Sequence, residues 1–423
     1  MSRKYFTAAL IIVCCLSAAG WDLQAGPTDL ELTSPKNEDH FEITKPLFFW
    51  KSVPAAHSYE IYVDDAKVGA VPVASVPVTS YGLTAPLAVG PHHWSVKALP
   101  AAGDAVSSSV STFTIDPAGN WPDWAIGPFE RYGGNPIVRP QGTGWEQVNT
   151  FNPGVLFDHG KFRMLYRAQG QKKGIAQVKD DGFSREGYAE SLDGVTFVRN
   201  PEPIIDATEP FEKKYGCEDA RFFKKDGVYY AFYTGNGPKG GVAICEATSS
   251  DGTTWKKLGP VVAGTKNAAM ICDPNGSPVQ INGNYAMFVG GAVCYSDDLI
   301  KWSPMTGIDL KLPADWVRSY EPCVAVTNYS SARPDDIVLF IAGTLNGKGK
   351  WFYAISEVLF SKKDLTQKVD QLNDCIMKPR ELYESGTFKN CLWMNCIIQH
   401  EGQWMMYYGA GDRNVGLATA PVK

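Results

Sequence analysis

The chain has 423 residues, a hydrophobic content of 44% and a net charge of −5 that is spread without long charged runs. This length is enough for two or three domains with large cores. The sequence has no basic patch, so nucleic acid is not an expected partner. Beyond the N-terminus no stretch is long and apolar enough to span a bilayer.

Residues 1–25 have the pattern of a secretory signal peptide. Arg3 and Lys4 precede a short apolar run, which small residues follow. A run this short after a basic start is typical of an export signal rather than of a buried helix. We expect cleavage near Gly20 or after Ala25, and a mature protein that is secreted or periplasmic.

Residues 27–116 carry short alternating segments typical of a β-sandwich. Residues 59–63 and 93–98 alternate apolar and polar side chains, and turn residues such as Asp64 separate such segments. The core Trp and Tyr residues resemble immunoglobulin-like or fibronectin type III modules of secreted carbohydrate enzymes. A spacer and a carbohydrate-binding module both remain open as its role. The Pro-, Gly- and Trp-rich residues 117–128 are predicted to form a linker.

Residues 129–423 repeat one phrase, a tight turn followed by a strand rich in aromatic and β-branched residues. Copies that recur about every 60 residues, with strands only, predict a five-bladed β-propeller. The fold class is therefore all-β, a five-bladed propeller preceded by a small β-sandwich domain. The copies are at residues 158–166, 226–233, 282–289 and 401–408, with a degenerate one at 335–341.

The fifth blade is incomplete at its end. Residues 135–138 match the segments that end other blades, such as residues 203–205. We therefore expect residues 121–140 to complete the last blade, because such closure removes exposed sheet edges. A second repeat contains Asp-Gly pairs, as at Asp193 and Asp251, which are turn formers rather than catalytic acids.

The histidines and cysteines limit the possible chemistry. Of the six histidines only His159 and His400 lie in the propeller, both in turns, so a His-based metal site or a Ser-His-Asp triad is not expected there. We predict no metal and no cofactor. All the cysteines except Cys14 and Cys15 lie in the propeller region. Their even number permits disulfides, but buried free thiols fit equally well.

Any catalysis in the propeller must therefore depend on carboxylate side chains. Counting back from each repeated turn gives the start of each innermost strand, which is acidic in three blades. These acids, Asp219, Asp273 and Glu321, are the catalytic candidates. Two acids across a sugar ring can hydrolyse a glycosidic bond.

Other polar and aromatic side chains are candidates for binding the substrate. Arg221 is two residues after Asp219, so strand alternation places both on one face, with Glu218 on the other. Asn152 and Arg167 belong to the first blade's inner strands. Three tryptophans outside the repeat positions are candidates for stacking on sugar rings. They are Trp145, Trp316 and Trp393.

Together these motifs resemble glycoside hydrolase family 130 over about residues 130–423. The resemblance implies a five-bladed propeller that cleaves β-mannosides by phosphorolysis or hydrolysis with inversion. It rests on Phe151-Asn-Pro-Gly-Val, Leu165-Tyr-Arg167, Gly216-Cys-Glu-Asp-Ala-Arg221, Lys266-Asn-Ala-Ala, Ile281-Asn-Gly-Asn-Tyr285, Tyr295-Ser-Asp-Asp-Leu-Ile-Lys-Trp302 and Tyr407-Tyr-Gly-Ala-Gly-Asp412.

The resemblance also implies residue roles. Asp219 would be the general acid, acting through a sugar hydroxyl. Asp412 would bind the sugar at the non-reducing end, and Lys266 matches a lysine that helps to hold phosphate in the phosphorylases. Polar subsite residues match at Asn152, Arg167 and Arg221.

The chain also departs from the family pattern. Ala220 replaces a proline, Val289-Gly290 replaces a His-Arg pair, and Ile341-Ala-Gly343 replaces Tyr-His-Gly. Loss of basic groups weakens a phosphate site. Export also makes phosphorolysis less useful, because the sugar phosphate would be lost outside the cell.

The leading hypothesis is therefore a secreted glycosidase that cleaves β-mannosides or related glycosides of an oligosaccharide or polysaccharide by inverting hydrolysis. Glu321 or Asp273 would be the base that activates water. Three alternatives stay open. They are a β-mannoside phosphorylase, another five-bladed glycosidase acting on arabinosides or xylosides, and a carbohydrate-binding propeller without catalysis.

Overall fold

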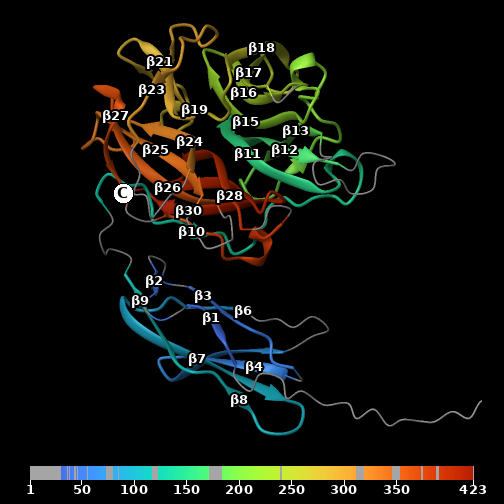
Figure 1. The fold of residues 1–423 in the computed structure, drawn as a ribbon, viewed down its shortest axis with the longest axis vertical. Helices are drawn as coiled ribbons and strands as arrows, with labels where there is room; N and C mark the ends of the chain where they lie inside the picture. The colour runs from blue at the N-terminus through green and yellow to red at the C-terminus, as the bar shows by residue number, and fades with distance from the viewer. Residues whose placement is uncertain are drawn as a thin grey trace, which may run out of the picture. The chain divides into compact units, whose positions relative to one another are not determined.

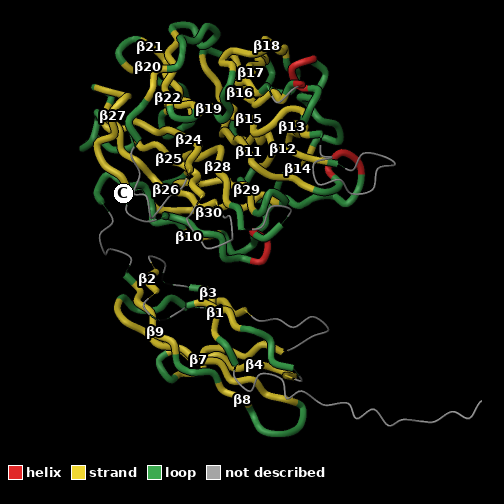
Figure 2. Tube along the Cα trace, viewed as in Figure 1, coloured by secondary structure: helices red, strands yellow, loops and turns green. Residues whose placement is uncertain are grey.

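The structure is a computed structural model whose strands are shown in Figures 1 and 2. It describes residues 30–422 except 36, 38, 42–43, 45, 55, 73–79, 84, 117–121, 171–182, 239–240, 311–318, 345–352, 373–374 and 387–389. The predicted signal peptide and Trp316 lie outside these residues. The chain divides into two compact units, Met1–Pro117 and Ala118–Lys423. Among the described residues, no helix has the length and apolar character needed to cross a membrane.

The first unit contains two sheets that share one core. Alternate residues of its long strands are buried, as the sequence predicted for 59–63 and 93–98. Phe48 and Trp50 of one sheet pack in the same cluster as Tyr59, Trp94 and Phe113 of the other. The comparison with immunoglobulin-like and fibronectin III modules stays a prediction. The first sheet is β1 (Leu32–Ser34), β3 (Leu47–Trp50) and β6 (Ser80–Gly82); the second is β2 (Asp39–Phe41), β9 (Ser111–Ile115), β7 (Gly90–Pro100), β4 (Ala56–Val63) and β5 (Ala66–Pro72), with β8 (Val106–Ser107) on β7.

The second unit is a β-propeller, and its innermost strands are β11, β15, β19, β24 and β28. Blade 1 is β11 (Asn149–Asp158), β12 (Lys161–Gln169), β13 (Ser184–Ser191) and β14 (Val198–Arg199); blade 2 is β15 (Gly216–Lys225), β16 (Val228–Asn236), β17 (Val242–Ser249) and β18 (Lys256–Ala263). Blade 3 is β19 (Ala268–Cys272), β21 (Asn284–Val289), β22 (Ala292–Ser296) and β23 (Thr306–Gly307), with β20 (Gln280–Ile281) on β21; blade 4 is β24 (Ser319–Thr327), β25 (Asp336–Thr344), β26 (Tyr353–Ser361) and β27 (Asp364–Gln371). Blade 5 is β28 (Leu392–His400), β29 (Gln403–Ala410), β30 (Asn414–Pro421) and β10 (Glu130–Arg131).

The repeated phrase forms the hairpin at the inner side of four blades. In each of these turns two successive residues have positive φ, which matches the twist of the flanking strands and favours glycine at the second position. The pairs are His159-Gly160, Asp226-Gly227, Asn282-Gly283 and Glu401-Gly402. Asp193 and Asp251 of the second repeat accept hydrogen bonds from backbone N–H groups of their own turns, as expected of turn formers.

Residues 130–138 complete the last blade, so the predicted ring closure is confirmed. β10 pairs antiparallel with β30, and Val138 forms a bridge with Val415. The Asn135 side chain donates to the carbonyl oxygen of Leu417 and accepts from its N–H, at 2.7 and 2.8 Å. The N-terminal segment of the unit thus supplies the outer strand that the C-terminus lacks.

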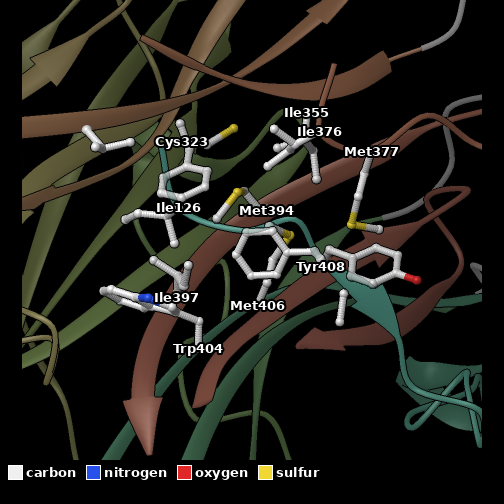
Figure 3. Close-up of a cluster of buried hydrophobic side chains, with 14 of the residues drawn as sticks. Ile126, Cys323, Ile355, Ile376, Met377, Met394, Ile397, Trp404, Met406 and Tyr408 are labelled. Carbon is white, nitrogen blue, oxygen red and sulfur yellow. The ribbon is translucent and has the colours of Figure 1, made fainter. Parts of the chain in front are cut away.

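Residues 122–128 correct the predicted linker. Trp124, Ala125 and Ile126 are buried in the core of blades 4 and 5, where Figure 3 shows Ile126 among Cys323, Met394 and Trp404. The indole Nε1 of Trp124 donates to Asp370 Oδ2 at 2.9 Å. Proline and glycine suggested a linker, but the apolar side chains between them bury against the propeller.

The eight cysteines that the structure describes are all free thiols, seven of them buried and Cys272 partly exposed. Of the two possibilities left open by their even number, the structure has the buried thiol. Six of them pack in the hydrophobic clusters of the blades, where a thiol acts as a small hydrophobic side chain; they are Cys217, Cys245, Cys272, Cys294, Cys323 and Cys396.

A buried glutamate recurs behind three blades and was not predicted. Each lies in a three-residue 3-10 helix, accepts from a tyrosine hydroxyl of the second strand, and pairs with a cation of the outer strand. The ion-pair distances are 2.8, 2.7 and 2.7 Å. The sets are Glu146, Tyr166 and Arg199; Glu212, Tyr233 and Lys257; and Glu384, Tyr408 and Arg131, with the helices η1 (Gly144–Glu146), η2 (Pro210–Glu212) and η4 (Leu382–Glu384).

This repeat makes the ring closure testable by one substitution. Arg131→Ala should lower the free energy of unfolding by about 3–5 kcal/mol, because it leaves the fully buried Glu384 carboxylate without its cation. Lys161→Ala breaks an exposed ion pair with Glu190 and should cost about 1 kcal/mol or less. Urea unfolding followed by tryptophan fluorescence measures both, and equal losses would contradict the structural role of the closing pair.

Candidate active site

Three innermost strands have a residue in the left-handed backbone conformation at or near their start. Asn152, Asp219 and Asn267 have φ of 48°, 59° and 63°. The pairing register shifts next to Asn152 in β11 and next to Asp219 in β15, which is the mark of a β-bulge. Non-glycine residues adopt this conformation at a cost, and such residues cluster at functional sites. Any side chain at Gly409 would collide with the Asn152 side chain, so the last blade leaves room for this bulge.

Asp219 is buried and held by two donors. Its Oδ1 accepts from Asn152 Nδ2 at 2.8 Å and from Arg167 Nη1 at 3.2 Å. Burial raises the pKa of Asp219, but the Arg167 charge and the Asn152 hydrogen bond outweigh it, so the net pKa lies below its usual range. Asp219 is therefore ionised in the free protein at neutral pH.

Arg167 joins Asp219 to Glu218, which the sequence had placed on the opposite face. Arg167 Nη2 donates to Glu218 Oε1 at 2.7 Å, and its Nε donates to Ser184 Oγ at 2.9 Å. The bulge at Asp219 breaks the strand alternation and turns both carboxylates to one side. Burial raises the pKa of Glu218, and the neighbouring Asp219 charge adds to this, although Arg167 opposes both.

Arg221, which strand alternation placed on the face of Asp219, donates to the backbone of Asp219 and not to its carboxylate. Its Nη1 donates to the backbone oxygen of Asp219 at 3.0 Å and to Asn267 Oδ1 at 3.3 Å, and Nη2 lies 3.5 Å from the Pro322 oxygen. Burial lowers the pKa of this guanidinium. Arg221 therefore ties together the inner strands of blades 2, 3 and 4.

Glu321 is the carboxylate of blade 4 in this cluster. Its Oε2 accepts from Lys266 Nζ at 3.1 Å and from Asn267 Nδ2. Glu321 and Lys266 are both partly exposed, with 24% and 48% of their side chains accessible. Burial lowers the pKa of Lys266, but the Glu321 carboxylate raises it more. The lysine is thus positioned by a carboxylate.

Asp412 reaches the same cluster from the turn between β29 and β30. Cys391 Sγ lies 3.6 Å from its Oδ1. Burial raises the pKa of Asp412 to about 6, with Arg167 opposing and Asp219 adding to the increase. The backbone oxygen of the next residue, Arg413, accepts from the N–H of Thr150 at 3.0 Å, which holds this turn beside β11 of blade 1.

Glu186 of β13 lies behind Asp219 and was missed by the sequence reasoning. It is fully buried, and its Oε1 is 3.3 Å from the N–H of Ala220. Its Oε2 has no hydrogen-bond partner among the described residues. Burial raises the pKa of Glu186 far above its usual range, and the Asp219 charge adds to this. No sequence signal indicated this role, because the same face of β13 also carries Ser184, Tyr188 and Glu190.

Several predicted site residues do not join the cluster. Asp273 follows β19 at the end opposite Asn267, and its Oδ1 accepts from the N–H groups of Asn275 and Ser277, so it forms a turn. Trp145 stacks on Tyr166 with ring centroids 6.3 Å apart and donates to the Pro201 oxygen.

Trp393 is buried, and its Nε1 donates to Asn395 Oδ1 at 2.8 Å. Both Trp145 and Trp393 therefore serve blade packing. Tyr353 lies edge-on to Trp393, with ring centroids 6.0 Å apart. It is a partly exposed aromatic residue that the sequence did not single out. Among the described residues, no group of three or more His, Cys, Asp or Glu side chains is arranged to hold a metal ion.

Residues 130–423 match the sequence model of a family described as beta-1,4-mannooligosaccharide phosphorylase. The chain belongs to glycoside hydrolase family 130. A 1,2-beta-oligomannan phosphorylase from a Thermoanaerobacter species is 28% identical over 316 residues, which cover 70% of this chain and 98% of that protein. The chain is thus an enzyme of a family that acts on mannosides.

Solved structures agree with this family and with the propeller. A putative glycoside hydrolase from Parabacteroides distasonis is 26% identical, with a TM-score of 0.63 over 70% of this chain and 97% of that one. A second structure is 27% identical, with a TM-score of 0.63 over 71% and 98% of the two chains. It is described with the statement that this family of mannoside phosphorylases contains glycoside hydrolases that target beta-1,2 mannosidic linkages in Candida mannan.

Proposed function

We propose that this chain hydrolyses β-mannosides with inversion and uses water rather than phosphate as the nucleophile. The observation that carries this proposal is that the cations of the site already bind oxygen atoms of the protein. Arg167 is divided between Glu218 and Asp219, and Lys266 pairs with Glu321. Arg221 donates to a backbone oxygen and to Asn267. Phosphate would have to compete with carboxylates for Arg167 and Lys266, and with the Asp219 backbone oxygen and Asn267 for Arg221.

The positions where the family resemblance places basic groups support the same conclusion. Val289 is fully buried in the hydrophobic cluster of blades 2 and 3. Ile341 is fully buried in the cluster of blades 3 and 4. Apolar side chains at these places supply no hydrogen-bond donors for a phosphate group, so binding a dianion would lack charge-assisted contacts.

The carboxylates suit the two roles of an inverting hydrolase. Asp219 belongs to the acid that protonates the glycosidic oxygen, and the electrons of the broken C–O bond stay on that oxygen. Glu321 accepts a proton from the water that attacks the anomeric carbon from the opposite face. Lys266 and Asn267 hold Glu321 in its orientation. Asn152 and Arg167 orient Asp219 in the same way.

Phosphorolysis is the second candidate, because the relative from Thermoanaerobacter is named a phosphorylase. The named hydrolases in the structural comparison support water as nucleophile. We also propose export, on the pattern of residues 1–25, and an immunoglobulin- or fibronectin III-like accessory module at residues 27–116.

Proton NMR of the products separates the two reactions. With a β-mannobiose substrate we expect free mannose released as the α-anomer, at a rate that is the same in phosphate and in phosphate-free buffer. A hydrolase needs only water, so the ratio of the two rates should stay within about twofold.

Three other results would each replace the proposal. Mannose 1-phosphate among the products, or a rate proportional to phosphate, would identify a phosphorylase. Cleavage of arabinosides or xylosides alone would show that the substrates are these sugars and not mannosides. Sugar binding without cleavage, measured by calorimetry, would identify a carbohydrate-binding propeller.

A further inference from the structure

Among the residues that the structure describes, the cluster holds more carboxyl groups than cations. Arg167, Arg221 and Lys266 are its cations. An unpaired charge away from water is costly, so some of the surplus carboxyls must keep a proton at neutral pH. The carboxyls are Glu186, Glu218, Asp219 and Glu321.

Position decides which neutral carboxyl can serve the reaction. Glu186 is fully buried behind the Ala220 peptide and cannot reach a substrate. Glu321 pairs with Lys266. Glu218 is accessible, with 16% of its side chain exposed against 10% for Asp219. It is thus the reachable carboxyl that shares its guanidinium with the proposed acid.

The guanidinium geometry makes the two carboxyls one unit. Arg167 Nη1 donates to Asp219 Oδ1 and Nη2 donates to Glu218 Oε1, at 3.2 and 2.7 Å. One positive charge is therefore divided between two consecutive residues that the bulge turns to the same side. Loss of the last proton would leave two anions on one cation, which is unfavourable in a desolvated site.

We propose that Glu218 and Asp219 act together as the acid and share a single proton beside Arg167, with Glu218 holding it before the substrate binds. This rests on the proposed glycoside cleavage. The pair gives its proton to the leaving oxygen, which keeps the electrons of the C–O bond, while the attacking water gives a proton to Glu321. Both carboxylates then lie on Arg167 until solvent returns one proton to the pair.

The test is the pH dependence of kcat for Glu218→Gln. Glutamine keeps the shape and the oxygen that faces Arg167 but removes the shared proton. Asp219 alone, held by Arg167, then loses its proton at lower pH, so the alkaline limb of kcat should move down by at least about one pH unit. At pH 7 the rate on β-mannobiose should fall at least about tenfold and recover as the pH is lowered.

Three further measurements distinguish this role from a structural one. A dinitrophenyl β-mannoside, whose leaving group needs no proton, should be cleaved within about twofold of the wild-type rate. Glu218→Asp keeps a carboxyl group, so the alkaline limb of its kcat profile should stay at the wild-type pH. The control Glu246→Gln replaces a fully buried glutamate of the same blade, outside the cluster, and should leave both rates and the profile unchanged.

An unmoved alkaline limb in Glu218→Gln would overturn the shared proton. The shared proton would also be overturned if the alkaline limb of the wild-type kcat profile lay at or below about pH 4, which is the range of an isolated aspartate. This holds whatever the variant does. If the wild-type enzyme cleaves no mannoside at all, the proposed function fails instead, which the same assay shows before any variant is compared.

Discussion

Asp219→Asn should lower kcat on β-mannobiose by at least about 10²-fold, the usual scale for losing a general acid. The amide keeps the hydrogen-bonding oxygen that Asn152 and Arg167 hold, so the bulge and the fold should persist. It cannot deliver a proton to the leaving oxygen. Steady-state kinetics with purified protein measures the loss, and the thermal midpoint from circular dichroism checks the fold.

Asp226→Asn is the matched control in the same blade. Asp226 is an exposed residue of the hairpin between β15 and β16, and asparagine before glycine suits that turn equally well. Its kcat should equal that of the wild type. If Asp219→Asn retains near-normal activity with a normal thermal midpoint, Asp219 is not part of the acid.

The ring of blades was predictable because it depends on periodic chemistry. Turns with two positive φ values need residues such as Asn, Asp and Gly, and the following strands need alternating burial. Both features are present in the sequence at four of the five repeats. Closure by residues 135–138 followed from the same logic, since their pattern matches the blade ends and the last blade lacked one.

The bulges were not predictable, and they decide the active site. Strand alternation placed Glu218 away from Asp219, and Arg221 beside its carboxylate. The left-handed conformation of Asp219 reverses this, so Glu218 joins the acid and Arg221 bonds to backbone oxygen instead. Aspartate adopts this conformation more readily than most residues, but its sequence does not say that it will do so inside a strand, because the surrounding contacts impose it there.

Blade 3 shows a second limit of prediction from sequence, because site residues were located by counting along the chain. A turn between β19 and β20 adds residues to the inner strand, so counting back from Gly283 reached Asp273 rather than Asn267. The structure places Asn267 in the left-handed position that corresponds to Asn152 and Asp219. Insertions within a repeat move residue numbers but not positions in space.

The tryptophans show the third limit. Trp145 and Trp393 lie outside the repeat and were expected to stack on sugars, yet both are fixed by indole hydrogen bonds within the blades. Sequence alone does not separate an aromatic that packs from one that binds, because both roles need the same flat apolar face.

Glu321→Gln should lower kcat by at least about 10²-fold, because the amide cannot accept the proton of the attacking water. Lys266 and Asn267 can still donate to the amide oxygen, so the side chain should keep its place. Azide needs no deprotonation before it attacks. We therefore expect sodium azide to restore turnover in this variant and to yield an α-mannosyl azide, which NMR would identify.

Asp273→Asn separates this base from the other carboxylate that the sequence offered. The Asp273 carboxylate accepts two backbone N–H groups of its own turn, and an asparagine oxygen can accept the same bonds. Its kcat should stay within about twofold of the wild type, with no response to azide. If Asp273→Asn instead loses activity that azide restores, while Glu321→Gln does not, the water is activated from blade 3 and the role of Glu321 is limited to holding Lys266.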